Sequence, residues 1–514
     1  MEKVHYIDLP KSLVKYDEII GNLVNKNENT LFRESMIVQA YLNEEITENL
    51  FFIILLKLVS SCYFNYNTFN GIIEEISNNI SHMGAFFEVS LNMSVSCLIY
   101  DEKRFIPKSC YFYIIRNFVK NGFISLDLAI SSFMEVIIGD HLNSGYQLEY
   151  YLWFLEEISN QKPDIFKTIS RSTNLIREEL MTHISEALET RNFTIIKEYY
   201  EYAVPIDSIE FAIQQDDESL VQKFMSDPAF SIKQEANITI FSRLSGMDKK
   251  TSLLYYAALK GSLNCFKTFL ICAKKNDFDP QFLHLCAIGG GNMDILHISN
   301  EKCVKCEDSL YYACVFNQNL IFDWIFSNYK SAIDYGKLFY LSCIHSNIHV
   351  LKMCIDKYEE INAKSKKALF SYMHALILYE NIDLAKFLIE NPLVEIKTNR
   401  KSEPLINVAA KCSVSTFKFV ASKPGFIKDT TNIDGETPLH ICVVSNNIRC
   451  LKFILENHTV DFNAKTKGGS TPLHYAVRMP NPTALDLLNS TQLVDNSITD
   501  NNGKPPFFYQ KVPE

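Results

Sequence analysis

The sequence has no excess of positive charge. Lys and Arg together number 50, against 60 Asp and Glu, which gives a formal net charge of −10 and a pI near 5.7. Proteins that bind nucleic acid usually carry a basic stripe or patch. The charge balance therefore argues against DNA or RNA as the partner of this chain.

The sequence also lacks an export signal and a long apolar run. The N-terminus, MEKVHYIDLPKS, has no apolar stretch after its charges, so we expect no secretory signal. The most apolar run, from Leu50 to Phe64, is too short for a stable membrane span, and Lys57 interrupts it. We expect it to form a buried helix, and we expect the 14 cysteines to be reduced thiols of a cytoplasmic protein.

A 34-residue repeat is present near the C-terminus. The tetrapeptide TPLH occurs at Thr437–His440 and again at Thr471–His474. Glycines keep the same spacing, two residues before each Thr and once more downstream: Gly435, Gly469 and Gly503. Several positions in one register at this period indicate a solenoid of stacked units.

The same helix–turn–helix pattern continues upstream in weaker form. Units begin near Thr182, Ser208, Ser252, Phe282, Ser309, Lys337, Ser371 and Pro404. In each unit a Thr or Ser suits the start of a first helix, where Pro is also tolerated. Gly261, Gly291 and Asn447 are expected to break the first helix before an apolar second helix. Residues 226–250 read as a loop inserted between units.

The pattern G-x-TPLH, helix, turn, helix and V-D-x-N-A resembles the ankyrin repeat, and the match is specific for residues 403–508. The order of segments also resembles large ankyrin families of parasitic protists. We therefore predict an all-α fold: an α-helical domain at 1–180, degenerate ankyrin-like repeats at 181–402 and regular repeats with a C-terminal cap at 403–514. This resemblance implies no catalytic activity.

Candidate metal and redox residues fit the repeat better than they fit a site. The spacing of Cys303 and Cys306 is that of a CxxC motif, but the chain has no second CxxC to complete a zinc site. Another cluster contains Cys343, His345, His349 and Cys354. There the repeat places Ser346 and Asn347 in a turn, so the two histidines fall on different helices. We expect no bound metal and no cofactor.

Other motifs have equally structural interpretations. His440 and His474 recur with the fold period, so we expect them to link adjacent units and not to act as catalytic bases. The run Gly289–Gly291 lacks the pattern of a phosphate-binding loop and is expected at an inter-helix turn. The acidic run Asp216–Glu218 lacks the spacing of a calcium loop.

The most economical prediction is a non-catalytic scaffold or adaptor that binds a protein partner. Ankyrin repeats usually make contacts through hairpin tips and the face of the inner helices. The resemblance places these contacts at Ile433, Asp434, Glu436, Val444, Ser445, Lys465, Lys467, Ser470 and Arg478. Two alternatives remain open. One is a membrane-peripheral adaptor that uses the Leu50–Phe64 run, and the other is an enzyme with its site in residues 1–180.

Overall fold

The regular secondary structure of the residues that the computed structural model describes is helical, and no strand occurs among them. The structure describes residues 9–24, 30–60, 66–99, 108–137, 152–161, 178–237, 251–274, 276–302, 308–328, 333–355, 373–374, 376–378, 381–390, 403–423, 431–457, 461–479 and 482–509. The predicted all-α fold is confirmed. Cys303 and Cys306 lie outside the described residues.

The chain divides into two compact units. Unit 1 comprises residues 1–83, 104–120 and 148–361, and unit 2 comprises residues 84–103, 121–147 and 362–514. The predicted domain boundaries after residues 180 and 402 stay predictions.

Unit 1 contains the N-terminal helices and the upstream helix pairs. Its first helices are α1 (Lys11–Val24), α2 (Thr30–Leu42), α3 (Glu48–Ser60), α4 (Tyr66–Asn78), the 3-10 helix η1 (Ile80–His82), α6 (Lys108–Lys120) and α9 (Leu155–Gln161). The pairs are α11 (Glu178–Thr190) with α12 (Thr194–Tyr202), α13 (Ile209–Gln214) with α14 (Glu218–Met225), α15 (Leu253–Lys260) with α16 (Leu263–Cys272), α17 (Pro280–Gly290) with α18 (Met293–Lys302), α19 (Ser309–Val315) with α20 (Asn319–Asn328), and α21 (Tyr335–Ile344) with α22 (Ile348–Ile355).

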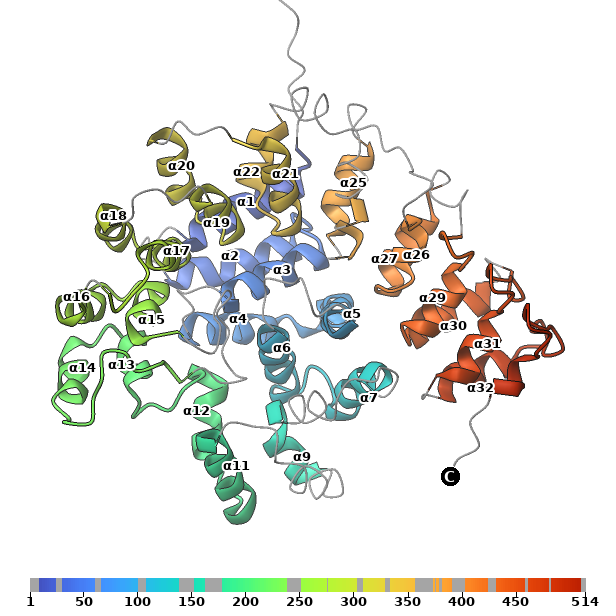
Figure 1. Ribbon diagram of the computed structural model, residues 1–514, viewed down its shortest axis with the longest axis horizontal. Helices are drawn as coiled ribbons and strands as arrows, with labels where there is room; N and C mark the ends of the chain where they lie inside the picture. The colour runs from blue at the N-terminus through green and yellow to red at the C-terminus, as the bar shows by residue number, and fades with distance from the viewer. Residues whose placement is uncertain are drawn as a thin grey trace, which may run out of the picture. The chain divides into compact units, whose positions relative to one another are not determined.

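The helix pairs of unit 1 stack in sequence order. The first helices α13, α15, α17, α19 and α21 each contact the next one, as do the second helices α14, α16 and α18. The stack can be followed in Figure 1 from green to yellow. This arrangement confirms the helix–turn–helix units expected from Ser208 to Lys337. Neither short helix of a pair is stable alone, so each depends on its neighbours in the stack.

In most of the described helix pairs the turn between the two helices contains one residue with positive φ, whereas the turn at 410–413 contains none. Gly261 and Gly291 occupy it with φ of 66° and 68°, as predicted. In the unit at 438–457 the residue is Asn446, with φ of 50°, so the prediction at Asn447 was wrong by one position. Asn447 instead caps the second helix, because its Oδ1 accepts the Cys450 backbone N–H at 3.2 Å.

Two of the three consecutive glycines lie in a helix, which corrects their expected place in a turn. Gly289 and Gly290 belong to α17, and only Gly291 ends it. A Cβ atom on Gly290 would lie 1.9 Å from the Ala258 carbonyl oxygen of α15. Glycine is therefore required there because the two helices approach each other closely.

Helix α3 is buried, as expected for the apolar run at Leu50. Leu50, Phe51 and Ile54 are 1% exposed or less. The Lys57 ammonium donates to Asn317 Oδ1 at 2.6 Å, to the His345 carbonyl at 2.7 Å and to the Ser346 carbonyl at 3.1 Å. Lys57 therefore joins α3 to the turn between α19 and α20 and to the turn between α21 and α22.

Unit 2 contains the TPLH segments. Its helices are α5 (Gly84–Ile99), α7 (Leu126–Ile137), α25 (Ile382–Glu390), α26 (Leu405–Ala409), α27 (Val414–Ala421), α29 (Pro438–Val444), α30 (Ile448–Asn457), α31 (Pro472–Arg478), α32 (Pro482–Ser490) and the 3-10 helix η4 (Pro506–Tyr509). The first elements α26, α29, α31 and η4 contact one another in order, and α27, α30 and α32 form the second row. The 34-residue period is therefore the period of the stack.

Leu439 supplies a test of this register, because its side chain is fully buried. We expect Leu439→Ala to lower the free energy of unfolding by about 2–5 kcal/mol, since it leaves a cavity. Contacts in a solenoid are between nearest neighbours, so hydrogen exchange should increase mainly in residues 405–509.

The matched control is Leu493→Ala, because the Leu493 side chain is 52% exposed. It should change stability by no more than about 0.5 kcal/mol. If both leucine variants unfolded at the same temperature as the parent chain, the register described here would be wrong.

Candidate functional site

The Thr-Pro-Leu-His segment begins the first helices α29 and α31 and joins each of them to the next repeat. Thr437 precedes α29 in extended conformation, and Pro438 takes the first helical position. The His440 Nδ1 atom accepts the Thr437 backbone N–H at 3.2 Å. That nitrogen therefore carries no proton, and the neutral ring must be protonated at Nε2. His440 Nε2 lies 3.2 Å from the Ser470 carbonyl oxygen, to which it donates.

The second copy repeats this geometry. His474 Nδ1 accepts the Thr471 N–H at 3.1 Å, and Nε2 lies 3.1 Å from the Lys504 carbonyl oxygen. Each histidine bonds to a carbonyl 30 residues further along the chain and so joins one repeat to the following repeat. Both are fully buried, and burial lowers the pKa of His440, which keeps the ring neutral. The prediction that these histidines link adjacent units is confirmed.

The hairpin tips are joined in the same register. The Lys467 N–H donates to the Asp434 carbonyl at 2.8 Å, and the Asn501 N–H donates to the Gly468 carbonyl at 3.1 Å. Gly435 and Gly469 have φ of 80° and 77°, a conformation that side chains disfavour. A Cβ atom on Gly469 would also lie 2.5 Å from Asn501 Oδ1. The spaced glycines thus permit both the turn and the close contact between tips.

Comparison with known protein families agrees with this geometry. Residues 405–500 match the model for ankyrin repeats, in three copies. This segment of the chain consists of ankyrin repeats. No curated protein matches the sequence. The finer resemblance to protist ankyrin families stays a prediction.

Most of the predicted contact residues of the ankyrin repeats lie at the surface. Ile433 is 61% and Val444 41% exposed. Asp434, Lys465, Lys467 and Arg478 are also exposed, whereas Glu436 and Ser445 are half-buried and Ser470 is buried. Glu436 accepts a hydrogen bond from the Tyr475 hydroxyl at 2.9 Å, and the Ser470 carbonyl serves the histidine bridge. The exposed residues are therefore the ones available to a partner, and the other three are held by contacts within the repeats.

The structure adds Lys504, Phe508 and Tyr509, which the sequence did not single out, to the predicted residue Arg478. The Arg478 guanidinium lies 3.9 Å from the centre of the Tyr509 ring, and the Lys504 ammonium lies 4.0 Å from that of Phe508. The one signal available beforehand was that Tyr475 and Tyr509 are 34 residues apart. The cations could not be assigned to these rings from spacing alone, because η4 departs from the helix that the repeat predicts.

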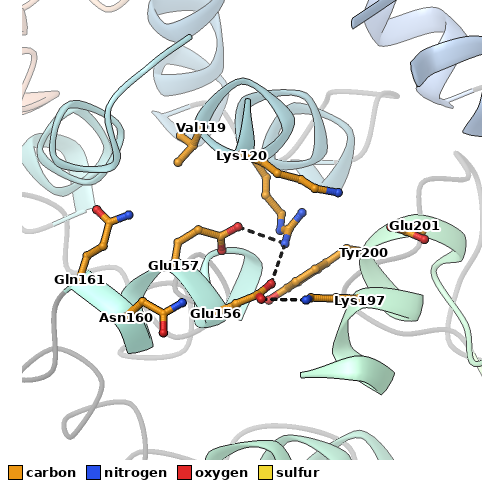
Figure 2. Close-up of a pocket in the computed structure, with 10 residues that line it drawn as sticks. Val119, Lys120, Glu156, Glu157, Asn160, Gln161, Lys197, Tyr200 and Glu201 are labelled. Atoms are coloured by element: carbon orange, nitrogen blue, oxygen red, sulfur yellow. Dashed lines mark ion pairs between the residues drawn. The ribbon is translucent and has the colours of Figure 1, made fainter. Parts of the chain in front are cut away.

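A cavity of about 340 Å³ lies in unit 1 (Figure 2). It is lined by Arg116, Val119, Lys120, Glu156, Glu157, Asn160, Gln161, Lys197, Tyr200 and Glu201. These residues come from α6, α9 and α12, three helices with no repeat register in common. Sequence reasoning missed the cavity for that reason.

The charged groups of this cavity neutralise one another. Arg116, 4% exposed, lies 3.1 Å from Glu157 Oε1 and 3.8 Å from Glu156 Oε2, and its guanidinium covers the Tyr200 ring. Lys197 pairs with Glu156 at 2.8 Å. Burial raises the pKa of Glu157, and the neighbouring Arg116 opposes that shift. The lining has no Ser, Cys or His to serve as a nucleophile or its base. The ion pairs therefore brace three helices against one another.

The other candidate residues named from the sequence bond to neighbouring residues of the fold or lie in different helices. His345 ends α21 and His349 lies in α22, where His349 Nε2 is 2.9 Å from Asp323 Oδ1. Burial and the nearby Lys57 lower the pKa of His345 to about 3. Among the residues with described positions, no group of three His, Cys, Asp or Glu side chains is placed to hold a metal ion. Asp216 caps α16 by accepting the backbone N–H of Cys265 at 3.0 Å.

No helix among those described is both long and apolar enough to cross a bilayer.

The bracing role of Arg116 can be measured directly. Arg116→Met removes one partner of a largely buried ion pair and leaves the Glu157 carboxylate, 13% exposed, without its cation. We expect a loss of about 3–5 kcal/mol of folding stability, measured by denaturant unfolding.

Lys197→Met is the matched control. The Lys197 side chain is 50% exposed, so losing its pair with Glu156 should cost about 1 kcal/mol or less. Equal stability of the two variants would contradict the bracing role and would make the cavity a candidate for ligand binding.

Proposed function

We propose that this chain is a non-catalytic scaffold or adaptor that binds a protein partner through the tips and inner-helix face of its C-terminal ankyrin repeats. Ankyrin repeats generally mediate protein–protein interaction. Within this chain, the stacking residues recur while the exposed residues differ, as expected of a recognition surface.

One observation carries the proposal. Ile433, Lys467 and Asn501 occupy equivalent places on successive tips, 34 residues apart, and all three are exposed. The backbone around them is held by the same glycines and tip-to-tip hydrogen bonds. An apolar, a basic and an amide side chain are therefore presented on one rigid frame. A frame that is fixed in advance lowers the entropy cost of binding.

The alternatives have less support. A membrane-peripheral adaptor was suggested by the apolar run at Leu50, but the described side chains of α3 are mostly buried. An enzyme with a site in residues 1–180 would draw on the charged cavity of unit 1, whose ion pairs are internal. A reducing compartment fits the cysteines, since the ten described are free thiols and nine of them are buried. This supports the cytoplasm as the proposed location.

Charge reversal at one tip tests the proposal. A photo-crosslinking amino acid at Ile433 of the full chain should form an adduct with one protein in an extract of the producing cells. Lys465→Glu with Lys467→Glu should reduce that adduct, because the side chains lie on the neighbouring tip. Thermal melting should stay near that of the parent chain, since exposed charges contribute about 0–1 kcal/mol to folding.

The control carries the same change of charge elsewhere. Lys418→Glu with Lys452→Glu alters two exposed lysines of the outer helices α27 and α30. It should leave the adduct unchanged. A crosslink that is insensitive to the tip reversal, or equally sensitive to the outer-helix reversal, would refute recognition by the tips.

A further inference from the structure

Two cations and two aromatic rings form one cluster at the end of the ankyrin stack. We define the terminal basic cluster as Arg478, Lys504, Phe508 and Tyr509. Arg478 covers the Tyr509 ring, Lys504 covers the Phe508 ring, and the two ring centres lie 5.4 Å apart at an interplanar angle of 88°. The rings hold both cations in place and orient their charges without neutralising them.

Neither cation of the cluster has a carboxylate partner among the described residues. Lysines elsewhere in the described chain do, as Lys337 with Asp308 and Lys411 with Glu403 show. The neighbouring tip adds Lys467, which is exposed, and Lys465, whose ammonium donates to the Thr499 carbonyl at 2.8 Å. These four cations lie at the end of α31 and on the second and third hairpin tips, residues 465–469 and 499–504, and none of them has an ion pair to a described acid.

The carboxylates of Asp500 and Glu436 are used by the fold. The Asp500 carboxylate accepts hydrogen bonds from the Tyr509 hydroxyl and from the backbone N–H groups of Asn502 and Lys504. These bonds lower the pKa of Asp500 to about 2. Glu436 accepts the Tyr475 hydroxyl and the Asn432 amide. Both carboxylates are held by hydrogen bonds within the hairpins, and neither forms an ion pair with Arg478 or Lys504.

We propose that the terminal basic cluster binds an acidic peptide segment of the protein partner, with carboxylates on Arg478 and Lys504 and an apolar side chain on Phe508. The proposal rests on the proposed function and specifies the chemistry of the partner. The guanidinium suits a carboxylate because its N–H groups match both oxygens. Phe508 is 58% exposed and offers apolar surface beside the two charges. Opposite charge would also increase the rate of association.

A single-stranded nucleic acid is the other polymer that pairs with cations and aromatic rings. The observations favour a peptide for two reasons. The cluster holds only two cations, which suffice for a short acidic segment, whereas a nucleic acid presents a phosphate at every nucleotide. The first hairpin tip, which lies beyond the second, carries Asp434 and Glu436, and it would oppose a run of phosphates continuing along the tips more than a short acidic segment.

Fluorescence anisotropy with defined probes tests the proposal on the full chain. The acidic probe is a labelled peptide of twelve residues, in which two Glu and two Asp flank a central Phe and the other positions are Gly and Ser. The neutral probe replaces every Glu with Gln and every Asp with Asn, and the third probe is a twelve-nucleotide oligothymidylate. The acidic peptide should bind more tightly than both, and its affinity should fall as salt is raised.

The variant Arg478→Gln with Lys504→Gln should weaken binding of the acidic peptide by about fivefold to tenfold, as expected for two surface charge contacts. Lys418→Gln with Lys452→Gln is the matched control. It removes the same charge, and Lys418 also lies over an aromatic ring, 4.8 Å from the centre of Phe453. It should leave binding unchanged. Phe508→Ala should weaken the acidic peptide while leaving the charges in place.

Three outcomes would overturn the inference: equal affinity for the acidic and neutral peptides, tighter binding of the oligothymidylate, or equal loss in the two double variants. These failures are distinct from failure of the proposed function. If the tip crosslink persisted while the acidic peptide did not bind, the chain would still bind a protein, but not by an acidic segment at this cluster.

Discussion

The C-terminal stack depends on a hydrogen bond from a buried histidine of one unit to a backbone carbonyl of the next. His440 reaches Ser470, and His474 reaches Lys504, each across 30 residues of sequence. The bond requires the ring to be neutral and protonated at Nε2, which the Thr at the start of the same helix enforces through Nδ1. A buried donor without this acceptor would be costly, so the units must stack in one register.

This constraint separates the part of a repeat that holds the fold from the part that faces solvent. The tips are held by a glycine, by one backbone hydrogen bond to the neighbouring tip, and by the Asn432 or Asp500 side chain that accepts backbone N–H groups. Exposed side chains such as Ile433, Lys467 and Asn501 differ from tip to tip while this frame is kept. The terminal basic cluster follows the third tip, next to the tip that carries Lys465 and Lys467. Unit 1 uses a different constraint, because Lys57 joins its third helix to two turns of the helix pairs through three oxygen acceptors.

Features that repeat could be predicted from the sequence. The period placed the TPLH histidines, the hairpin glycines and the turns at Gly261 and Gly291 correctly. It failed at two places where the same residue type has more than one structural role. Gly289 and Gly290 allow a close approach of helices and do not form a turn. Of two consecutive asparagines, Asn446 and not Asn447 has the positive φ.

Long-range contacts without a period were beyond sequence reasoning. The three acceptors of Lys57 lie at least 260 residues away along the chain. The cavity around Arg116 and Glu157 combines helices with no common spacing. The pairing of Arg478 with Tyr509 depends on how the last element turns after the third hairpin.

The tautomer of the TPLH histidines tests the account most directly. Nitrogen-15 NMR of histidine-labelled full-length protein distinguishes protonated from unprotonated ring nitrogens, and the variants His440→Gln and His474→Gln assign the two signals. Both rings should show a protonated Nε2 and an unprotonated Nδ1 at pH 7, with slow exchange of the Nε2 proton. His440 should remain neutral on acidification to pH 6, because burial lowers its pKa. Two protonated nitrogens at pH 7, or a proton on Nδ1 alone, would contradict the histidine bridge between units.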